Sequence, residues 1–235
     1  MLGISSLFRI FPFVALVISV FLLGFLLIGG ASTDTAYSSV FLVKAAFNET
    51  LPLLRSGNFS VPALTIKANY LALCVSTADQ IMCSLSRNVS SLMSATTVSS
   101  GSVTFSLVAV AQAMLEVCKP HLLVTSIVLI LLLLVFVIYT GFPFVPAKLI
   151  ASKIASVLTG LTVLVWGLGC MLQLQGVDGA REFIGVASMG MVVVLPGGRA
   201  HAMAWTAFAF VLTAFTCLSA GVMREHYLNK PKEKF

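Results

Sequence analysis

Four long apolar segments constrain the fold of this chain more than any other feature. They cover residues 10–30, 122–140, 154–173 and 200–223. Each is close to the roughly 20 residues that a helix needs to cross the hydrocarbon core of a bilayer. A soluble domain cannot bury four such segments in succession, so the sequence predicts a bundle of four transmembrane helices.

The scarcity of charge supports this assignment. Only 9% of the residues are charged and the mean hydropathy is +1.05, whereas soluble domains carry about 25% charged residues. The formal net charge is +6, but the basic residues form no dense patch, so no nucleic-acid partner is expected. The first apolar segment could instead be a cleaved signal peptide, because small residues follow it. Its length exceeds that of a signal core and favours a retained anchor.

The basic residues also predict the orientation. Among the termini and the short loops, one side of the membrane receives Arg9, Lys148, Lys153, Arg224, Lys230, Lys232 and Lys234, and the other receives Arg181 and Arg199. The basic residues of 31–120 are not counted, because that loop is too long for the rule to apply. Positive residues favour the cytosolic side, so both termini are expected there. The resulting segments outside the spans are a cytosolic N-terminus (1–9), a first outer loop (31–120), a cytosolic loop (141–153), a second outer loop (176–199) and a basic cytosolic tail (224–235) that could contact anionic lipid.

The first outer loop contains all the N-glycosylation triplets of the chain. The acceptor pattern Asn-x-Ser/Thr begins at Asn48, Asn58 and Asn88. Glycan is added only on the lumenal side, so three triplets in one loop indicate an extracellular loop. This topology agrees with the one predicted by the basic residues.

Cys74 and Cys83 mark the structured part of this loop. Apolar residues flank both cysteines, and Ser76–Asp79 between them is turn-like. The spacing suits two short strands joined by a loop, and an oxidising compartment favours a disulfide between them. Cys118 could be free, pair with another chain or compete for one of these two. Cys170 and Cys217 lie within spans, where a thiol acts as a small apolar residue.

Local patterns predict further elements of the first outer loop. Residues 39–47 suit a short amphipathic helix, 59–75 one or two strands, and 80–85 a partner strand. Residues 91–102 form a Ser/Thr/Gly linker, and 103–117 have helical spacing that would extend the second span outward.

Two later segments have specific interpretations. Residues 183–195 carry no charge and are too short to span. They favour a strand at Met191–Leu195 that joins the sheet of the first loop, and a re-entrant segment is the alternative. In the third span, Gly160, Gly167 and Gly169 with Ala155 and Ser156 predict a small-residue face for close helix contact.

No signature of an enzyme is present, and neither a cofactor nor a metal site is expected. The three histidines are scattered, and the acidic residues of the first outer loop are isolated. No Asp, Glu, Lys or Arg lies deep within a span, which speaks against a self-contained transporter.

The topology and the cysteine pair resemble the claudin-like superfamily, although the tryptophan of the claudin motif is absent. The chain is more similar to the fungal calcium-regulator and membrane-fusion family, the pheromone-induced mating proteins. That family has Gly, two apolar residues, Gly, any residue and Cys, followed by a second Cys. The matching residues here are Asn69, Tyr70, Leu71, Ala72, Leu73, Cys74 and Cys83, with Asn69 and Ala72 in place of the glycines.

This resemblance implies a plasma-membrane protein that acts in mating, cell fusion and low-affinity calcium influx, and it does not imply an enzyme. The predicted fold is an all-α membrane bundle with a small β-rich extracellular domain. The expected partners are membrane lipid and a protein, or a second copy, bound through the outer loop and the transmembrane helices. A claudin-type adhesion protein without a calcium role and a channel subunit are the alternatives.

Overall fold

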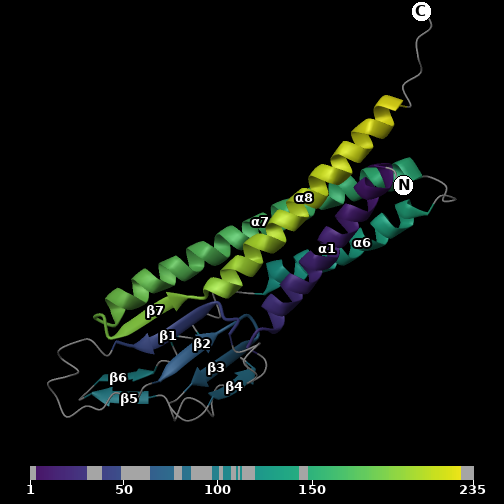
Figure 1. The fold of residues 1–235 in the computed structure, drawn as a ribbon. Helices are drawn as coiled ribbons and strands as arrows, with labels where there is room; N and C mark the ends of the chain where they lie inside the picture. Colours follow the sequence, from purple (N-terminus) through teal and green to yellow (C-terminus); the bar gives the residue numbers. More distant parts are fainter. Residues whose placement is uncertain are drawn as a thin grey trace, which may run out of the picture. The chain divides into compact units, whose positions relative to one another are not determined.

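The computed structural model contains four long helices that overlap the four apolar segments (Figure 1). It describes residues 4–30, 39–48, 64–76, 81–85, 97–100, 103–106, 110, 112, 120–142 and 148–228. Within those residues, four helices are long and apolar enough to cross a membrane. The fold is therefore a four-helix membrane bundle with a small antiparallel sheet, as the sequence predicts.

The helices are longer than the apolar segments that reveal them. They are α1 (Ile4–Ile28), α6 (His121–Gly141), α7 (Lys148–Ala187) and α8 (Gly198–Leu228). The 40 residues of α7 measure about 60 Å, twice the roughly 30 Å of a hydrocarbon core. Hydropathy identifies only the part of a helix that lipid surrounds, so it does not reveal the polar continuation of α7 beyond residue 173.

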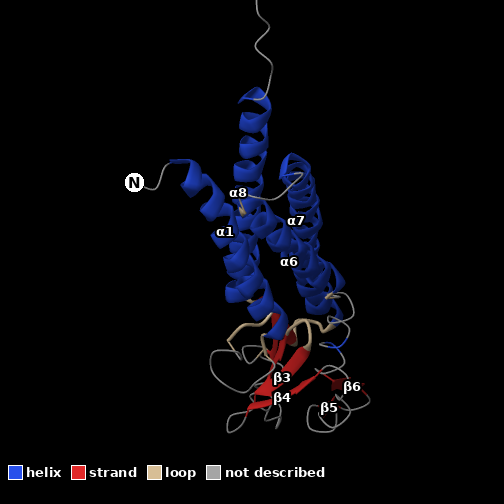
Figure 2. Cartoon of the chain, turned by 90° about the vertical axis from the view of Figure 1, so that its right-hand side faces the viewer, coloured by secondary structure: helices blue, strands red, loops and turns tan. Residues whose placement is uncertain are grey.

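The chain divides into two compact units, each built from segments that are not consecutive in the sequence. Unit 1 consists of Met1–Gly24, Leu122–Cys170 and Ala204–Phe235. Unit 2 consists of Phe25–His121 and Met171–Met203, and it contains all the described strands. Figure 2 distinguishes the helices in blue from the strands in red.

Within unit 1, aromatic rings of α8 pack against two glycines of α7. A methyl group at Gly160 would lie 3.2 Å from the Phe215 ring, and one at Gly167 would lie 3.1 Å from the Phe208 ring. The Trp166 indole N–H donates a hydrogen bond to Ala204 O at 3.2 Å. The predicted small-residue face therefore exists, and the chain itself occupies it at these two glycines.

Unit 2 contains a five-stranded antiparallel sheet in the order β4-β3-β2-β1-β7. Its strands are β1 (Val43–Phe47), β2 (Thr65–Ala68), β3 (Ala72–Ser76), β4 (Ile81–Leu85) and β7 (Val192–Pro196). The central strand pairs β1–β2 and β2–β3 come from the first outer loop. A second sheet pairs β5 (Thr97–Ser100) with β6 (Val103–Ser106).

The strand β7 resolves the alternatives for residues 183–195. Val192–Pro196 pairs with β1 in the register Ala45↔Val194, so this part is a sheet strand and not a re-entrant segment. Residues 183–187 instead complete α7. The β-branched run correctly predicted the strand. The end of α7 at residues 183–187 was not predicted, because it is as free of charge as the strand that follows.

Three local predictions in the first outer loop were wrong. Residues 43–47, expected as a helix, form β1, because Val43 and Ala45 are buried in a sheet that pairs on both sides. Residues 97–100 of the expected linker form β5, and 103–106 of the expected helix form β6. The register Ser100↔Val103 leaves a two-residue Gly-Ser connection, a hairpin signal that local helical spacing concealed.

Replacement of Gly167 by leucine should destabilise the contact between α7 and α8. The new side chain would overlap the Phe208 ring, and overpacking costs about 1–3 kcal/mol. Thermal unfolding in detergent, followed by the fluorescence of Trp166 and Trp205, should show a lower midpoint. Gly221→Leu is the matched control, because no atom lies within 4 Å of that position. Equal midpoints for the two variants would contradict this packing.

Candidate functional site

The two predicted cysteines are bonded to each other in unit 2. Cys74 of β3 lies directly opposite Cys83 of β4 in the register of the sheet, and their sulfur atoms form a disulfide. Cys74 is buried and Cys83 is half-buried. The disulfide therefore joins an interior strand to the edge strand β4, as the strand–loop–strand interpretation predicts.

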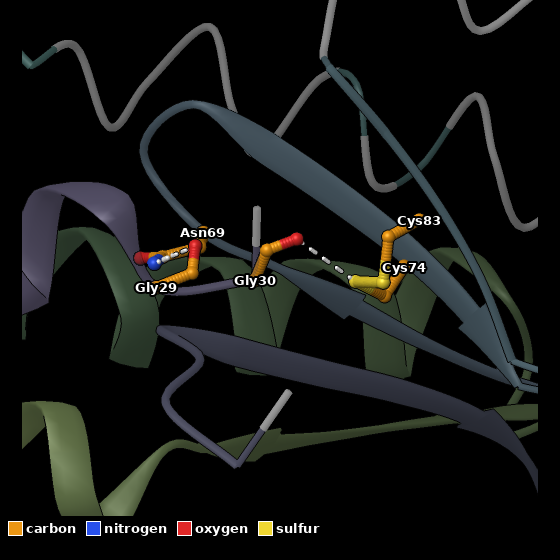
Figure 3. Close-up of a disulfide and its surroundings, with 5 residues drawn as sticks. All are labelled: Gly29, Gly30, Asn69, Cys74 and Cys83. Carbon is orange, nitrogen blue, oxygen red and sulfur yellow. Dashed lines mark hydrogen bonds between the residues drawn. A yellow bond between two sulfur atoms is a disulfide. The ribbon is translucent and has the colours of Figure 1, made fainter. Parts of the chain in front are cut away.

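Asn69 connects the turn between β2 and β3 to the end of α1. Its side chain is only 1% exposed. Its Nδ2 donates hydrogen bonds to Gly29 O (Figure 3) and, at 3.1 Å, to Leu26 O, while its backbone N–H donates to Ala72 O at 2.9 Å. The last carbonyls of a helix have no partner within the helix. The Asn69 amide supplies that partner.

Two glycines at the end of α1 make room for this contact. A methyl group at Gly29 would lie 2.3 Å from Asn69 Nδ2 and 2.9 Å from Val40 Cγ1. Gly30 has a φ of 73°, the left-handed conformation in which helices often end. A glycine pair after an apolar helix is a C-terminal capping signal. In the sequence, these two residues end the first apolar segment and are also among the small residues that suggest a cleavage site.

The disulfide lies against the same helix end. Gly30 O is 3.2 Å from Cys74 Sγ (Figure 3). A sulfur in a disulfide has no proton, so this is a close contact in the oxidised protein; only a reduced thiol could donate to the carbonyl. Gly29, Gly30, Asn69, Cys74 and Cys83 together form what we call the α1 exit site.

One polar atom of this site lacks a partner. Asn69 Oδ1 is buried and, among the residues that the structure describes, accepts no hydrogen bond. Reversal of the amide would place Oδ1 against the two carbonyls that Nδ2 now contacts, which electrostatic repulsion opposes. A buried polar atom without a partner costs about 1–3 kcal/mol. The two hydrogen bonds of Nδ2 offset this cost.

The other residues of the family motif complete the turn between β2 and β3. Tyr70 is buried and its hydroxyl donates to Gln173 Oε1 at 3.0 Å, so the turn also contacts α7 within unit 2. Leu71 is partly exposed. Ala72 is buried at the first position of β3. The motif thus positions the turn against the end of α1 and against α7 at Gln173.

One predicted glycosylation site lies in the described region. Asn48 follows β1, and its Nδ2 donates to Gly190 O at 3.2 Å while its backbone N–H donates to Met191 O at 2.9 Å. Asn58, Asn88 and Cys118 lie outside the described residues. In the described part of the chain, no three His, Cys, Asp or Glu side chains gather into a possible metal site.

Replacement of Gly29 by alanine should loosen the α1 exit site. The new methyl group would displace the Asn69 amide, so the backbone amides of β2 and β3 should exchange hydrogen faster in detergent micelles. Gly24→Ala is the matched control in the same helix, because that position has no atom within 4 Å.

A second substitution tests the coupling between these residues. Asn69→Gly should partly restore protection in the Gly29→Ala background, because it removes one of the two obstructed contacts, and contacting residues typically couple by about 0.5–3 kcal/mol. If Gly29→Ala were as mild as Gly24→Ala, the described contact would be incorrect.

Comparison with known proteins places these features in a family. The sequence model of the family described as "Ca2+ regulator and membrane fusion protein Fig1" matches residues 55–224, which include Asn69 and both bonded cysteines. The chain is also 27% identical to the Factor-induced gene 1 protein of Saccharomyces cerevisiae over 240 residues, which cover 87% of this chain and 80% of the relative. The chain therefore belongs to the family of the Ca2+ regulator and membrane fusion protein Fig1.

Proposed function

We propose that this protein regulates calcium influx and membrane fusion in the fungal plasma membrane during mating, and that it regulates calcium entry without forming the pore itself. Membership of the family gives the calcium and fusion roles. The mating context extends from the factor-induced yeast relative and from the resemblance of the motif. The proposal that the protein is not an enzyme rests on the same resemblance.

The interior of unit 1 supports an indirect role in calcium entry. The buried polar residues in its described helices are Ser19, Ser126, Thr159 and Thr162. Each hydroxyl donates to the carbonyl four residues earlier in its own helix: Ala15, Leu122, Ala155 and Leu158. A conducting path needs oxygens that replace the hydration shell of the ion. In the described helices of unit 1, the buried polar side chains are these four hydroxyls, with no carboxylate or amide among them, and this observation carries the proposal.

The disulfide supports an extracellular position for unit 2, with both termini in the cytosol. Disulfides persist in oxidising compartments, and Cys74–Cys83 belongs to unit 2. The three glycosylation triplets begin in the same unit, and we extend the proposal to glycan at Asn48, Asn58 and Asn88. At Asn48, the attached amide would keep one N–H for its bond to Gly190 O.

Unit 2 is also where we place a protein partner. The glycines Gly160 and Gly167 are already packed against α8, so association through that face would displace internal contacts. The strands β4 and β7 lie at the two edges of the five-stranded sheet. Edge strands and the apolar side chains that they expose are typical association surfaces.

The orientation predicts that N-glycosidase lowers the mass of the protein isolated from fungal cells. Combined replacement of Asn48, Asn58 and Asn88 by glutamine should abolish the change. Glutamine is not a glycan acceptor but keeps a side-chain amide. An unchanged mass after enzyme treatment of the native protein would contradict glycosylation. Cleavage of unit 2 only by protease from the cytosolic side would contradict the orientation.

The indirect role predicts that the purified protein does not conduct calcium by itself. Proteoliposomes that contain an enclosed calcium dye should fill no faster than protein-free vesicles, and an added ionophore is the positive control. The same preparation must show the Cys74–Cys83 bond by mass spectrometry, so that silence is not caused by misfolding. Rapid filling without any partner would overturn the indirect role in favour of a channel subunit.

Mating cells provide the complementary measurement. Cells that lack this protein should take up less calcium and fuse less often, and re-expression should restore both. Reduced fusion with normal calcium uptake would instead support the alternative, a claudin-type adhesion protein without a calcium role.

A further inference from the structure

Three large apolar side chains project together from the end of α7. Phe183 is 75% exposed, Val186 is 81% exposed and Met189 is 85% exposed. The spacing of three residues places Phe183 and Val186 on neighbouring turns of one helix face, and Met189 follows directly after the helix. We call these three residues the apolar tip. All of them belong to unit 2.

A tight turn holds the apolar tip in place. Ser188 N–H donates to Ile184 O, Met189 N–H to Val186 O and Gly190 N–H to Gly185 O, at 2.9, 3.1 and 2.9 Å. The buried Ser188 hydroxyl accepts a further bond from Val192 N–H at 3.2 Å, which connects the turn to β7. The projecting side chains are therefore attached to an ordered backbone.

The fold does not account for methionine at position 189. Its φ is 51°, a left-handed conformation that suits glycine or asparagine and strains other residues. Its side chain is also almost wholly exposed, so it contributes nothing to the core of unit 2. An exposed apolar residue in an unfavourable backbone conformation indicates a requirement outside the folded chain.

Charged residues limit how far the apolar tip could insert into a bilayer. Asp178, Arg181 and Glu182 are exposed on the turns just before it, whereas residues 183–198 carry no charge. The helix rises about 7.5 Å between Glu182 and Ala187 at 1.5 Å per residue. Interfacial elements bury their apolar faces about 5–10 Å into a bilayer. The spacing therefore matches shallow insertion that ends at the charged turns.

The membrane that the apolar tip would enter is the one that faces the protein during fusion. Leu172 and Val186 are 14 positions apart on α7, which separates them by about 21 Å along the helix. Gln175, Asp178, Arg181 and Glu182 lie between them. The sequence predicts that α7 leaves its own hydrocarbon near residue 173, and the charged turns that follow separate the apolar tip from it, whereas membrane fusion brings a second bilayer close.

From this arrangement, we propose that Phe183, Val186 and Met189 insert into the outer leaflet of the facing membrane. A lipid surface is favoured over a protein pocket because the three side chains are at least 75% exposed and the charged turns before them match the depth of shallow insertion. The proposal rests on the fusion role of the family and is independent of calcium entry.

The test uses the full chain in proteoliposomes and protein-free phosphatidylcholine vesicles with brominated acyl chains. Bromine quenches tryptophan fluorescence only at short range, so a Phe183→Trp variant reports contact with the acceptor lipid. The emission of the added tryptophan is the difference between the variant and the native protein, which contains only Trp166 and Trp205. This difference should fall at least twofold when acceptor vesicles are added. A lipid-mixing dye in the same sample identifies quenching that precedes fusion.

Substitution provides the matched comparison. Val186→Asn combined with Met189→Asn should reduce vesicle docking at least fivefold. Asparagine tolerates the left-handed backbone at position 189, so the thermal midpoint should not fall. Gly179→Asn is the control, because position 179 is exposed on α7 in the same unit and an added side chain would meet no atom within 4 Å, and docking should remain at the native level.

Three results would overturn the proposal: no quenching of the Phe183→Trp reporter, native docking by the double variant, or docking that requires protein in the acceptor vesicles. The last result would assign the apolar tip to a protein partner or a second copy. None of these measurements involves calcium or mating cells, so their failure is distinguishable from failure of the proposed regulatory function.

Discussion

The contact between the Asn69 amide and the last carbonyls of α1 organises unit 2. Leu26 O and Gly29 O need hydrogen-bond donors, and the turn between β2 and β3 provides one amide for both. Gly29 has no side chain that would obstruct the amide, and Gly30 turns the backbone towards Cys74. The disulfide then fixes β4 to the same strand. Helix end, turn and disulfide thus depend on one another sterically.

Unit 2 is assembled from two segments that are distant in sequence. The strands β1 to β4 come from the first outer loop, and β7 arrives from beyond α7 to pair with β1. The turn at Ser188 joins the end of α7 to this strand and also supports the apolar tip. Contact with a partner or a membrane at the tip would therefore act directly on the edge of the sheet. This arrangement connects the outer surface to the fusion role of the family.

Unit 1 contrasts with unit 2 in how it satisfies polar groups. Its buried hydroxyls bond to their own helices, and glycine–phenylalanine contacts bring α7 and α8 together. Such packing supports the proposal that the helices have a supporting role. The likeness to claudins, which rests on topology and cysteine spacing, stays a prediction of the sequence.

The sequence alone determined the four helices, the Cys74–Cys83 bond and the strand before Pro196, because each leaves a strong local pattern: a long apolar run, a cysteine pair around a turn, or a β-branched run before glycine. The tertiary structure decided that residues 43–47 form a strand and that Asn69 reaches the end of α1. It also decided that Val186 and Met189 are exposed beside the buried Ser188. The first two outcomes depend on contacts between segments that are far apart in the sequence, and no local pattern shows which distant residue will lie beside a given side chain.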